Sequence, residues 1–212
     1  GKIHQNRIIH KNINPSNLIL NPYSGEVKFI DFGIATELPK ENQSLQHPSK
    51  VEGTLAYISP EQSGRMNREI DYRTDLYSFG ITLFELLTGE PPFQSANALD
   101  LIHQHIAKQP PSPSELNPEI PNTVSAIILK LLAKNAEDRY QSAYGLQMDL
   151  EECQRQWLAK NRIDEFEIGQ KDRNNQFQIP QKLYGREKDI EKMLAVFNSI
   201  MQGSSELLLI TG

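Results

Sequence analysis

Two oxygen-bearing side chains flank a predicted β-hairpin and could hold a metal ion there. Asn17 precedes the apolar run Leu18–Leu20, and Asp31 follows the apolar run 27–30. Turn-forming residues at 21–25 join the two runs, so they are predicted to pair as strands. Mg²⁺ takes few protein oxygens and leaves its other positions to phosphates. The amide and the carboxylate therefore predict a magnesium clamp for a phosphate-bearing ligand.

Three motifs then occur in the order found in a protein kinase C-terminal lobe. His-Lys-Asn-Ile-Asn-Pro-Ser-Asn at 10–17 resembles the catalytic loop H-R-D-x-x-x-x-N, Asp-Phe-Gly at 31–33 matches D-F-G, and Ser-Pro-Glu at 59–61 resembles A-P-E. Residues 53–57 resemble the substrate-docking segment of serine/threonine kinases, and residues 75–80 resemble the buried helix behind the catalytic loop. The resemblance to serine/threonine protein kinases covers residues 1–152.

This resemblance implies a binding site for ATP and Mg²⁺. Asp31 would bind the ion that bridges the ATP phosphates, and Asn17 would hold the second ion. Thr54 would help to place the substrate hydroxyl. The positions implied at the nucleotide are Ile19, as the floor under adenine, Ile30 and Gly33. Structural roles are implied for His10 under Phe32, for Asp75 behind the catalytic loop, and for Glu61 paired with Arg139.

The catalytic loop departs from the family pattern at the residues that perform the transfer. Asn12 stands where the catalytic Asp is expected, and an amide cannot accept a proton near neutral pH. General-base assistance contributes about 10²–10⁴-fold, so most activity should be lost. Asn14 replaces the loop lysine and removes a charge beside the phosphate. Lys11 replaces the loop arginine and lacks its bidentate fork.

These observations leave three functions open. The family function is ATP-dependent phosphoryl transfer to Ser or Thr hydroxyls of proteins in cytoplasmic signalling. The first alternative is a pseudokinase that binds a nucleotide or a partner and regulates an attached ATPase. The second makes the ATPase the working part and the kinase lobe a scaffold. Asn12 favours the alternatives, whereas the intact Asn17, Asp31 and Gly33 favour the enzyme.

Composition fits a globular protein that has no nucleic-acid partner and no membrane span in this segment. The 212 residues carry 22 Lys and Arg against 27 Asp and Glu, a net charge of −5, which gives no electrostatic reason to bind nucleic acid. The longest apolar run, 207–210, is far shorter than the roughly 20 residues of a membrane helix. A single cysteine, Cys153, cannot form an internal disulfide, so the fold needs no oxidising compartment.

The fold class predicted from these patterns is α+β. The lobe should be mainly α-helical with the catalytic-loop hairpin, and apolar periodicity predicts its helices near residues 76–87, 99–106, 124–132 and 144–158. The polar stretch 161–181 has the composition of a linker. We expect a kinase-like lobe over 1–155, a linker over 156–182, and a second domain from 183.

The second domain should be the start of an AAA-type ATPase. Residues 183–187, an amphipathic stripe from Ile190 to Met201, and the strand 207–210 resemble the entry to that domain. Gly212 would be the first glycine of a P-loop. Kinase lobe, linker and ATPase in this order resemble large multi-domain bacterial sensor kinases. Both ends are expected to be cut, with the N-terminal lobe missing, so the chain alone should be inactive.

Overall fold

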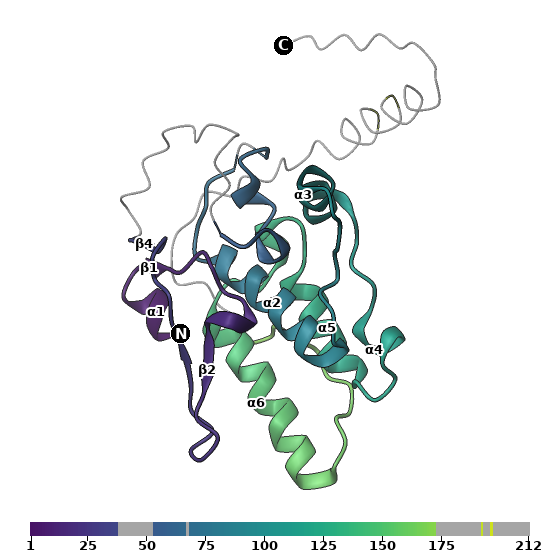
Figure 1. Cartoon of the computed structure of the whole chain (residues 1–212). Helices are drawn as coiled ribbons and strands as arrows, with labels where there is room; N and C mark the ends of the chain where they lie inside the picture. The colour runs from purple at the N-terminus through teal and green to yellow at the C-terminus, as the bar shows by residue number, and fades with distance from the viewer. Residues whose placement is uncertain (38–52, 67, 173–191, 193–195, 197–212) are drawn as a thin grey trace. The chain divides into compact units, whose positions relative to one another are not determined.

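The computed structural model describes residues 1–37, 53–66, 68–172, 192 and 196 (Figure 1). The chain divides into two compact units, Gly1–Phe177 and Gln178–Gly212. In the second unit the described residues, Lys192 and Val196, are helical. The predicted strand 207–210 and Gly212 lie outside the described residues, as does most of the stripe from Ile190 to Met201.

The strands near Asn17 and Asp31, the residues of the predicted magnesium clamp, form two small antiparallel sheets. Strand β1 (Ile8–Ile9) pairs with β4 (Thr36–Glu37), and β2 (Leu18–Leu20) pairs with β3 (Val27–Phe29). In the second pair Leu18 lies opposite Phe29. The turn is closed by two backbone hydrogen bonds, from the Asn21 amide to the Glu26 carbonyl and from the Gly25 amide to the Asn21 carbonyl. The predicted hairpin is confirmed.

Helix α2 (Arg73–Thr88) lies at the centre of the first unit (Figure 1). Most of its side chains are buried, which fits a sequence that is apolar on most sides. The helix ends at Gly89, which adopts a left-handed conformation and donates its amide to the Glu85 carbonyl. Glycine takes this conformation without a steric penalty, so it is the usual helix terminator.

Three further long helices pack around α2, and their predicted positions are confirmed to within a few residues. They are α3 (Ala98–Ala107), α5 (Asn122–Leu131) and α6 (Ala143–Lys160). Asn97 accepts two amide hydrogen bonds at the start of α3, and Ser142 accepts one at the start of α6. These caps satisfy amides that have no partner within a helix.

The remaining elements are single turns that the sequence did not indicate. They are the α-helical turns α1 (Lys2–Gln5) and α4 (Pro113–Leu116) and the 3₁₀ turns η1 (Pro15–Asn17), η2 (Leu55–Tyr57), η3 (Glu61–Ser63) and η4 (Ala136–Asp138). Helix α4 begins at Pro113, in the proline-rich stretch 110–113 between α3 and α5. The observed architecture is helix-rich with small antiparallel sheets, which agrees with the predicted α+β class. No helix in the described ranges has the length and apolarity needed to cross a membrane.

Two buried apolar clusters meet at α2. One lies toward α3, and its members are Tyr77, Ile81, Phe84, Phe93, Leu101, Ile128 and Leu132. The other lies toward α6, and its members are Leu76, Ile127, Leu131, Tyr140, Leu146 and Cys153. Helices α2 and α5 contribute to both clusters, so they connect the two parts of the core.

Residues 161–172, which follow α6, pack within the first unit. Ile163, Phe166 and Ile168 pack against the α6 cluster. The Asp172 carboxylate accepts hydrogen bonds from the Gln141 amide at 2.6 Å and from the Ser142 hydroxyl at 2.8 Å. The boundary predicted at 155 thus falls inside α6, and the first half of the polar stretch 161–181 is held by the lobe.

Candidate functional site

The backbone of the catalytic loop is held by a buried carboxylate from α2. Asp75, 1% exposed, accepts the His10 amide on Oδ2 at 2.9 Å and the Lys11 amide on Oδ1 at 2.8 Å. His4 Nε2 lies 2.8 Å from Asp75 Oδ2. Lys11 has a φ of 65°, a left-handed conformation that costs energy for a residue other than glycine. The two bonds to Asp75 stabilise that conformation.

The backbone of Ile30 forms hydrogen bonds with Asn17, at the other end of the hairpin, and with the His10 side chain. Its amide donates to the Asn17 carbonyl at 3.0 Å, and its carbonyl oxygen lies 3.0 Å from His10 Nε2. The His10 ring lies 4.6 Å from the Phe32 ring, centroid to centroid. Asp31 follows directly, with a φ of 62°. The catalytic loop and the Asp-Phe-Gly segment therefore share one hydrogen-bonded framework.

Asn12 lies at the centre of the candidate site and uses both ends of its amide. Its Oδ1 accepts the Thr54 amide at 3.2 Å and the Thr54 hydroxyl at 3.1 Å. Its Nδ2 donates to Asp31 Oδ2 over a long 3.5 Å. A carboxylate could accept from Thr54 equally well, but it could not donate to Asp31. The amide therefore fits both neighbours.

Two more asparagines close the loop around Asn12. Asn14 Nδ2 donates to Asn12 Oδ1 at 3.2 Å, and its own Oδ1 accepts the Ser16 amide at 3.0 Å. Asn17 Nδ2 donates to the Asn12 carbonyl at 2.8 Å. This bond uses the side-chain nitrogen of Asn17, so the amide oxygen is the side-chain atom that could bind a metal ion.

The donor set fits the magnesium ion that the sequence predicts. Asp31 is exposed, and its carboxylate receives long hydrogen bonds, 3.3 Å from the Gly33 amide and 3.5 Å from Asn12. Carboxylate and amide oxygens are the ligands that Mg²⁺ prefers, and the ion keeps its other positions for water and phosphate. No group of three or more His, Cys, Asp or Glu side chains in the described ranges is arranged for a metal ion.

The residues predicted at the nucleotide lie on the exposed side of the hairpin. Ile19 is 53% exposed and Ile30 39% exposed, and Gly33 is exposed as well. Leu20 and Val27 on the same hairpin are also exposed. Such a surface is available to an apolar ligand or to another part of the protein.

The segment that carries Thr54 contacts the catalytic loop at the carbonyl oxygen of Lys11. Gly53 has a φ of 103°, and a Cβ atom there would lie 3.1 Å from the Lys11 carbonyl oxygen. Gln62 Nε2 donates to the same oxygen at 2.9 Å, while Gln62 Oε1 accepts the Ser59 amide. Sequence patterns did not indicate Gln62, and they did not indicate His4, because both act through contacts distant in the chain.

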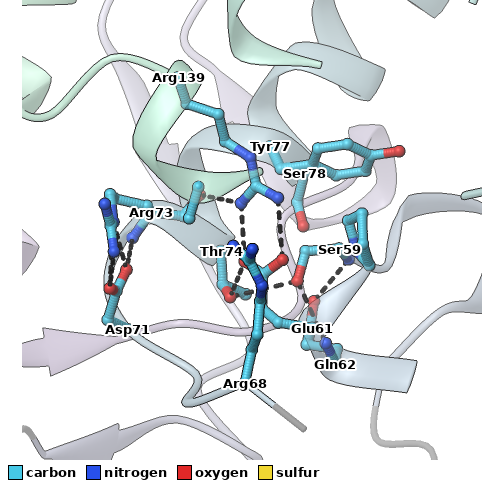
Figure 2. A network of polar contacts seen from close by, with 12 residues as sticks. Ser59, Glu61, Gln62, Arg68, Asp71, Arg73, Thr74, Tyr77, Ser78 and Arg139 are labelled. Carbon is cyan, nitrogen blue, oxygen red and sulfur yellow. Dashed lines mark hydrogen bonds and ion pairs between the residues drawn. The ribbon is translucent and has the colours of Figure 1, made fainter. Parts of the chain in front are cut away.

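A buried ion pair joins this segment to Arg139, the residue that follows η4 (Figure 2). Arg139 Nη1 donates to Glu61 Oε1 at 2.6 Å and Nη2 to Oε2 at 2.8 Å, with both side chains almost fully buried. Burial alone would raise the pKa of Glu61, but the charge and hydrogen bonds of Arg139 outweigh it and lower that pKa. Thr74 adds a hydroxyl bond to Glu61 Oε1 at 2.8 Å.

Comparison with known proteins assigns the family. Residues 2–150 match the family model described as protein kinase domain. The chain belongs to the protein kinase family. The match contains the catalytic loop, the Asp-Phe-Gly segment and the ion pair, so these features lie in the frame of a kinase domain.

The related kinases are much longer than this chain. The serine/threonine-protein kinase PknB of Mycobacterium tuberculosis is 40% identical over 147 residues, which cover 69% of this chain and 23% of the relative. A probable serine/threonine-protein kinase of Streptomyces coelicolor is 40% identical over 150 residues, 71% of this chain and 22% of the relative. The hybrid signal transduction histidine kinase G of Dictyostelium discoideum is 39% identical over 179 aligned positions, 75% of this chain and 5% of the relative. The matched part of this kinase chain thus spans less than a quarter of the length of each of these relatives.

Proposed function

We propose that this chain is the C-terminal lobe of a serine/threonine protein kinase that transfers phosphate from ATP to protein hydroxyls and lacks its catalytic base. The observation that carries this proposal is the position of Asn12 between Asp31 and Thr54. A group in that place contacts both the metal ligand and the residue proposed to position the substrate hydroxyl. The 40% identity to serine/threonine kinases supports the acceptor class.

Different site residues would bind the metal ion, the nucleotide and the acceptor hydroxyl. Asp31 and Asn17 would hold Mg²⁺, which neutralises charge on the phosphates when it is bound. Ile19, Ile30 and Gly33 would contact the nucleotide, with the exposed Ile19 as the apolar floor under adenine. Thr54 would orient the acceptor hydroxyl.

Asn12 limits the rate rather than the binding. Its amide can orient a hydroxyl through hydrogen bonds, but it cannot take up the proton that leaves. Loss of general-base assistance costs about 10²–10⁴-fold in rate. Asn14 adds no positive charge near the transferred phosphate, so the loop offers little electrostatic compensation. We therefore expect a slow kinase that still binds Mg·ATP.

The proposal also includes the domains that would flank this lobe in the full-length protein. An N-terminal lobe would complete the ATP site above the exposed hairpin. A linker would lead to an AAA-type ATPase beginning at residue 183, with Gly212 opening its P-loop. The resemblance of residues 183–187 and 207–212 to that domain supports this arrangement. Use of ATP favours the cytoplasm, with protein substrates or regulated partners.

A regulatory pseudokinase is the second candidate, and one contact favours it. Asn12 Nδ2 donates to Asp31, the residue proposed to hold Mg²⁺. A hydrogen bond between these two side chains stabilises the loop without a metal ion. In this second reading the lobe would bind nucleotide or a partner and control the attached ATPase, with little or no transfer.

Nucleotide binding by the full-length protein tests the proposal. Calorimetric titration with Mg·ATP should give saturable binding that Asp31→Ala abolishes or weakens by at least about tenfold, since a charge-assisted metal contact is lost. Glu119→Ala, an exposed change far from the hairpin in sequence, is the matched control and should bind as the unmodified protein does. Equal binding by the Asp31→Ala protein would contradict the role of Asp31.

A further inference from the structure

The peptide group that joins Lys11 to Asn12 is held by side chains. Residues 10–12 lie outside the helices and strands, between β1 and η1. The Lys11 carbonyl oxygen accepts a hydrogen bond from Gln62 Nε2 at 2.9 Å, and the Asn12 amide donates to His10 Nδ1 at 3.3 Å. The φ of Lys11, 65°, is one that helices and strands do not contain. The orientation of this peptide group therefore depends on the side chains that bind it.

Gln62 is fixed at both ends of its side-chain amide. A backbone amide can only donate, so the Ser59 amide, 2.9 Å away, must face Gln62 Oε1. The Gln62 nitrogen is thereby directed at the Lys11 carbonyl oxygen. The side chain is only 5% exposed, and a buried polar group that loses its partner is costly. Gln62 thus joins η3 to the catalytic loop through a bond made in the interior.

The turn that carries Gln62 is anchored independently of the catalytic loop. Its neighbour Glu61 forms the buried ion pair with Arg139 (Figure 2). Within the turn, the Ser63 hydroxyl donates to the Pro60 carbonyl at 2.5 Å. The amide of Gln62 therefore extends from a fixed base toward the loop, and the loop peptide takes its orientation from that base.

A rotation of the Lys11–Asn12 peptide would move the Asn12 side chain. Its Oδ1 accepts the Thr54 hydroxyl at 3.1 Å, and its Nδ2 donates to Asp31 over 3.5 Å. The second contact is at the limit of hydrogen-bond geometry, so a small rotation is enough to break it. A catalytic group misplaced by about 1 Å can lose about 10²-fold in rate. The bond from Gln62 therefore bears on the geometry of the group in the catalytic position.

We propose that Gln62 is a positioning residue, which fixes the Lys11–Asn12 peptide and thereby directs the Asn12 side chain between Asp31 and Thr54. The inference rests on the proposed function, in which Asn12 occupies the position of the catalytic base. Gln62 acts through the loop backbone and leaves the affinity for Mg·ATP unchanged. A residue with a packing role alone would affect stability and not the order of the loop.

Hydrogen exchange in the full-length protein tests this role without any need for turnover. Gln62→Met removes both hydrogen bonds of the amide at similar length and volume. Gln156→Met is the matched control, because Gln156 is 7% exposed and also uses both ends of its amide, within α6 and toward the segment after it. We expect the amides of Asn12 and Thr54 to exchange roughly tenfold faster in Gln62→Met, and at the unmodified rate in Gln156→Met.

Kinetics separates positioning from binding. In the Asn12→Asp protein, the added change Gln62→Met should lower kcat about tenfold, while the KM for the acceptor and the affinity for Mg·ATP change by less than about twofold. Gln156→Met should leave kcat unchanged, although both variants should lower the urea midpoint. If the Asn12→Asp protein does not turn over, the proposed function fails, and hydrogen exchange alone decides the inference.

Two results would overturn the inference. One is exchange at Asn12 and Thr54 that is the same in Gln62→Met and Gln156→Met. The other is a kcat that both variants lower equally. If Gln62→Met does not fold, Gln62→Glu keeps the shape and the acceptor oxygen, but its ionised carboxylate has no proton to donate to the Lys11 oxygen. Gln62→Glu should accelerate the same amides at least about threefold, and unchanged exchange would then reject the inference.

Discussion

The guanidinium of Arg139 has all five of its N–H groups satisfied in the interior. Two bonds reach Glu61, and the others reach the carbonyl oxygens of Arg73, Ala133 and Lys134. The group also lies 4.9 Å from the centroid of the Tyr77 ring. A charge that is fully hydrogen-bonded in this way becomes costly as soon as its partner is removed.

Glu61→Ala should therefore destabilise the lobe strongly. The change leaves the Arg139 charge buried without its counter-ion, which costs about 3–5 kcal/mol in the free energy of unfolding. Urea unfolding of the chain measures it as a fall in the midpoint. Glu119→Ala, on the exposed surface, should change the midpoint little. Similar midpoints for the two variants would contradict the buried pair.

His105 should make stability depend on pH between 7.5 and 5. Its pKa is about 4 when folded against 6.5 ordinarily, so in this window the unfolded chain binds a proton that the folded chain does not. The free energy of unfolding should thus fall by about 2 kcal/mol as the pH drops from 7.5 to 5. The lowered pKa of Glu61 affects stability mainly at lower pH. The ionised Glu61 carboxylate stabilises the fold above the ordinary pKa of 4.5, and this stabilisation is lost as the pH falls further.

Urea unfolding at the two pH values isolates this contribution. His105→Gln cannot be protonated in either state, so its stability should change less over the window than that of the unmodified chain. His103→Gln, with an exposed side chain, should keep the full dependence. An identical pH dependence in all three proteins would show that His105 is not held neutral by the fold.

At the scale of elements, the segment after α6 completes the packing of that helix. The Gly169 amide donates to Asp149 Oδ2 at 2.7 Å, and Thr123 donates its hydroxyl to the Asp164 carbonyl. Asp172 accepts bonds from two residues at the start of α6. Gly145 leaves room for this contact, since a Cβ atom there would lie 2.6 Å from the Asp172 Cα atom.

Gly145→Ala should consequently destabilise the chain. Alanine in an exposed helix is worth about 1 kcal/mol over glycine, but here its methyl group collides with Asp172 and displaces two hydrogen bonds. We expect a net loss of about 1–3 kcal/mol in urea unfolding. In Asp172→Ala, the same Gly145→Ala change should cost less, because the collision is relieved. A stabilising Gly145→Ala would show that the segment does not pack there.

The elements with strong local signals were predictable from the sequence. Apolar periodicity located α2, α3, α5 and α6, and turn residues located the β2–β3 hairpin, because these signals are local. The packing of Ile163, Phe166 and Ile168 was not predicted, since three apolar residues in a polar stretch show no helical or strand period. Their burial depends on a groove made by distant residues.

The candidate site was predictable where motif order identifies a residue, and less so elsewhere. Motif order placed Asn12, Asn17 and Asp31 near one another, and the structure brings these side chains and backbones within hydrogen-bonding distance. Burial of His105 could have been inferred, because it follows the buried Leu101 and Ile102 by four and three residues on one helical face. Its contacts with Tyr77 and Phe93 required the fold.

At the scale of the whole molecule, the proposed kinase depends on parts beyond this chain. The hairpin presents Ile19, Leu20 and Val27 to the outside, each more than half exposed. A nucleotide and an N-terminal lobe would cover this apolar surface. The lobe described here contains the proposed metal ligands and the proposed acceptor segment, so their chemistry has to be tested in the full-length protein.

The rate of phosphate transfer by Asn12→Asp in the full-length protein tests the central claim most directly. Asp has nearly the shape of Asn, can still accept from Thr54, and supplies the missing base. We predict that phosphate incorporated per minute into an acceptor protein rises by about 10²–10⁴-fold, while the affinity for Mg·ATP stays similar. The rise should disappear in the double variant with Asp31→Ala. Equal rates for the unmodified and Asn12→Asp proteins, or no nucleotide binding by either, would contradict the account.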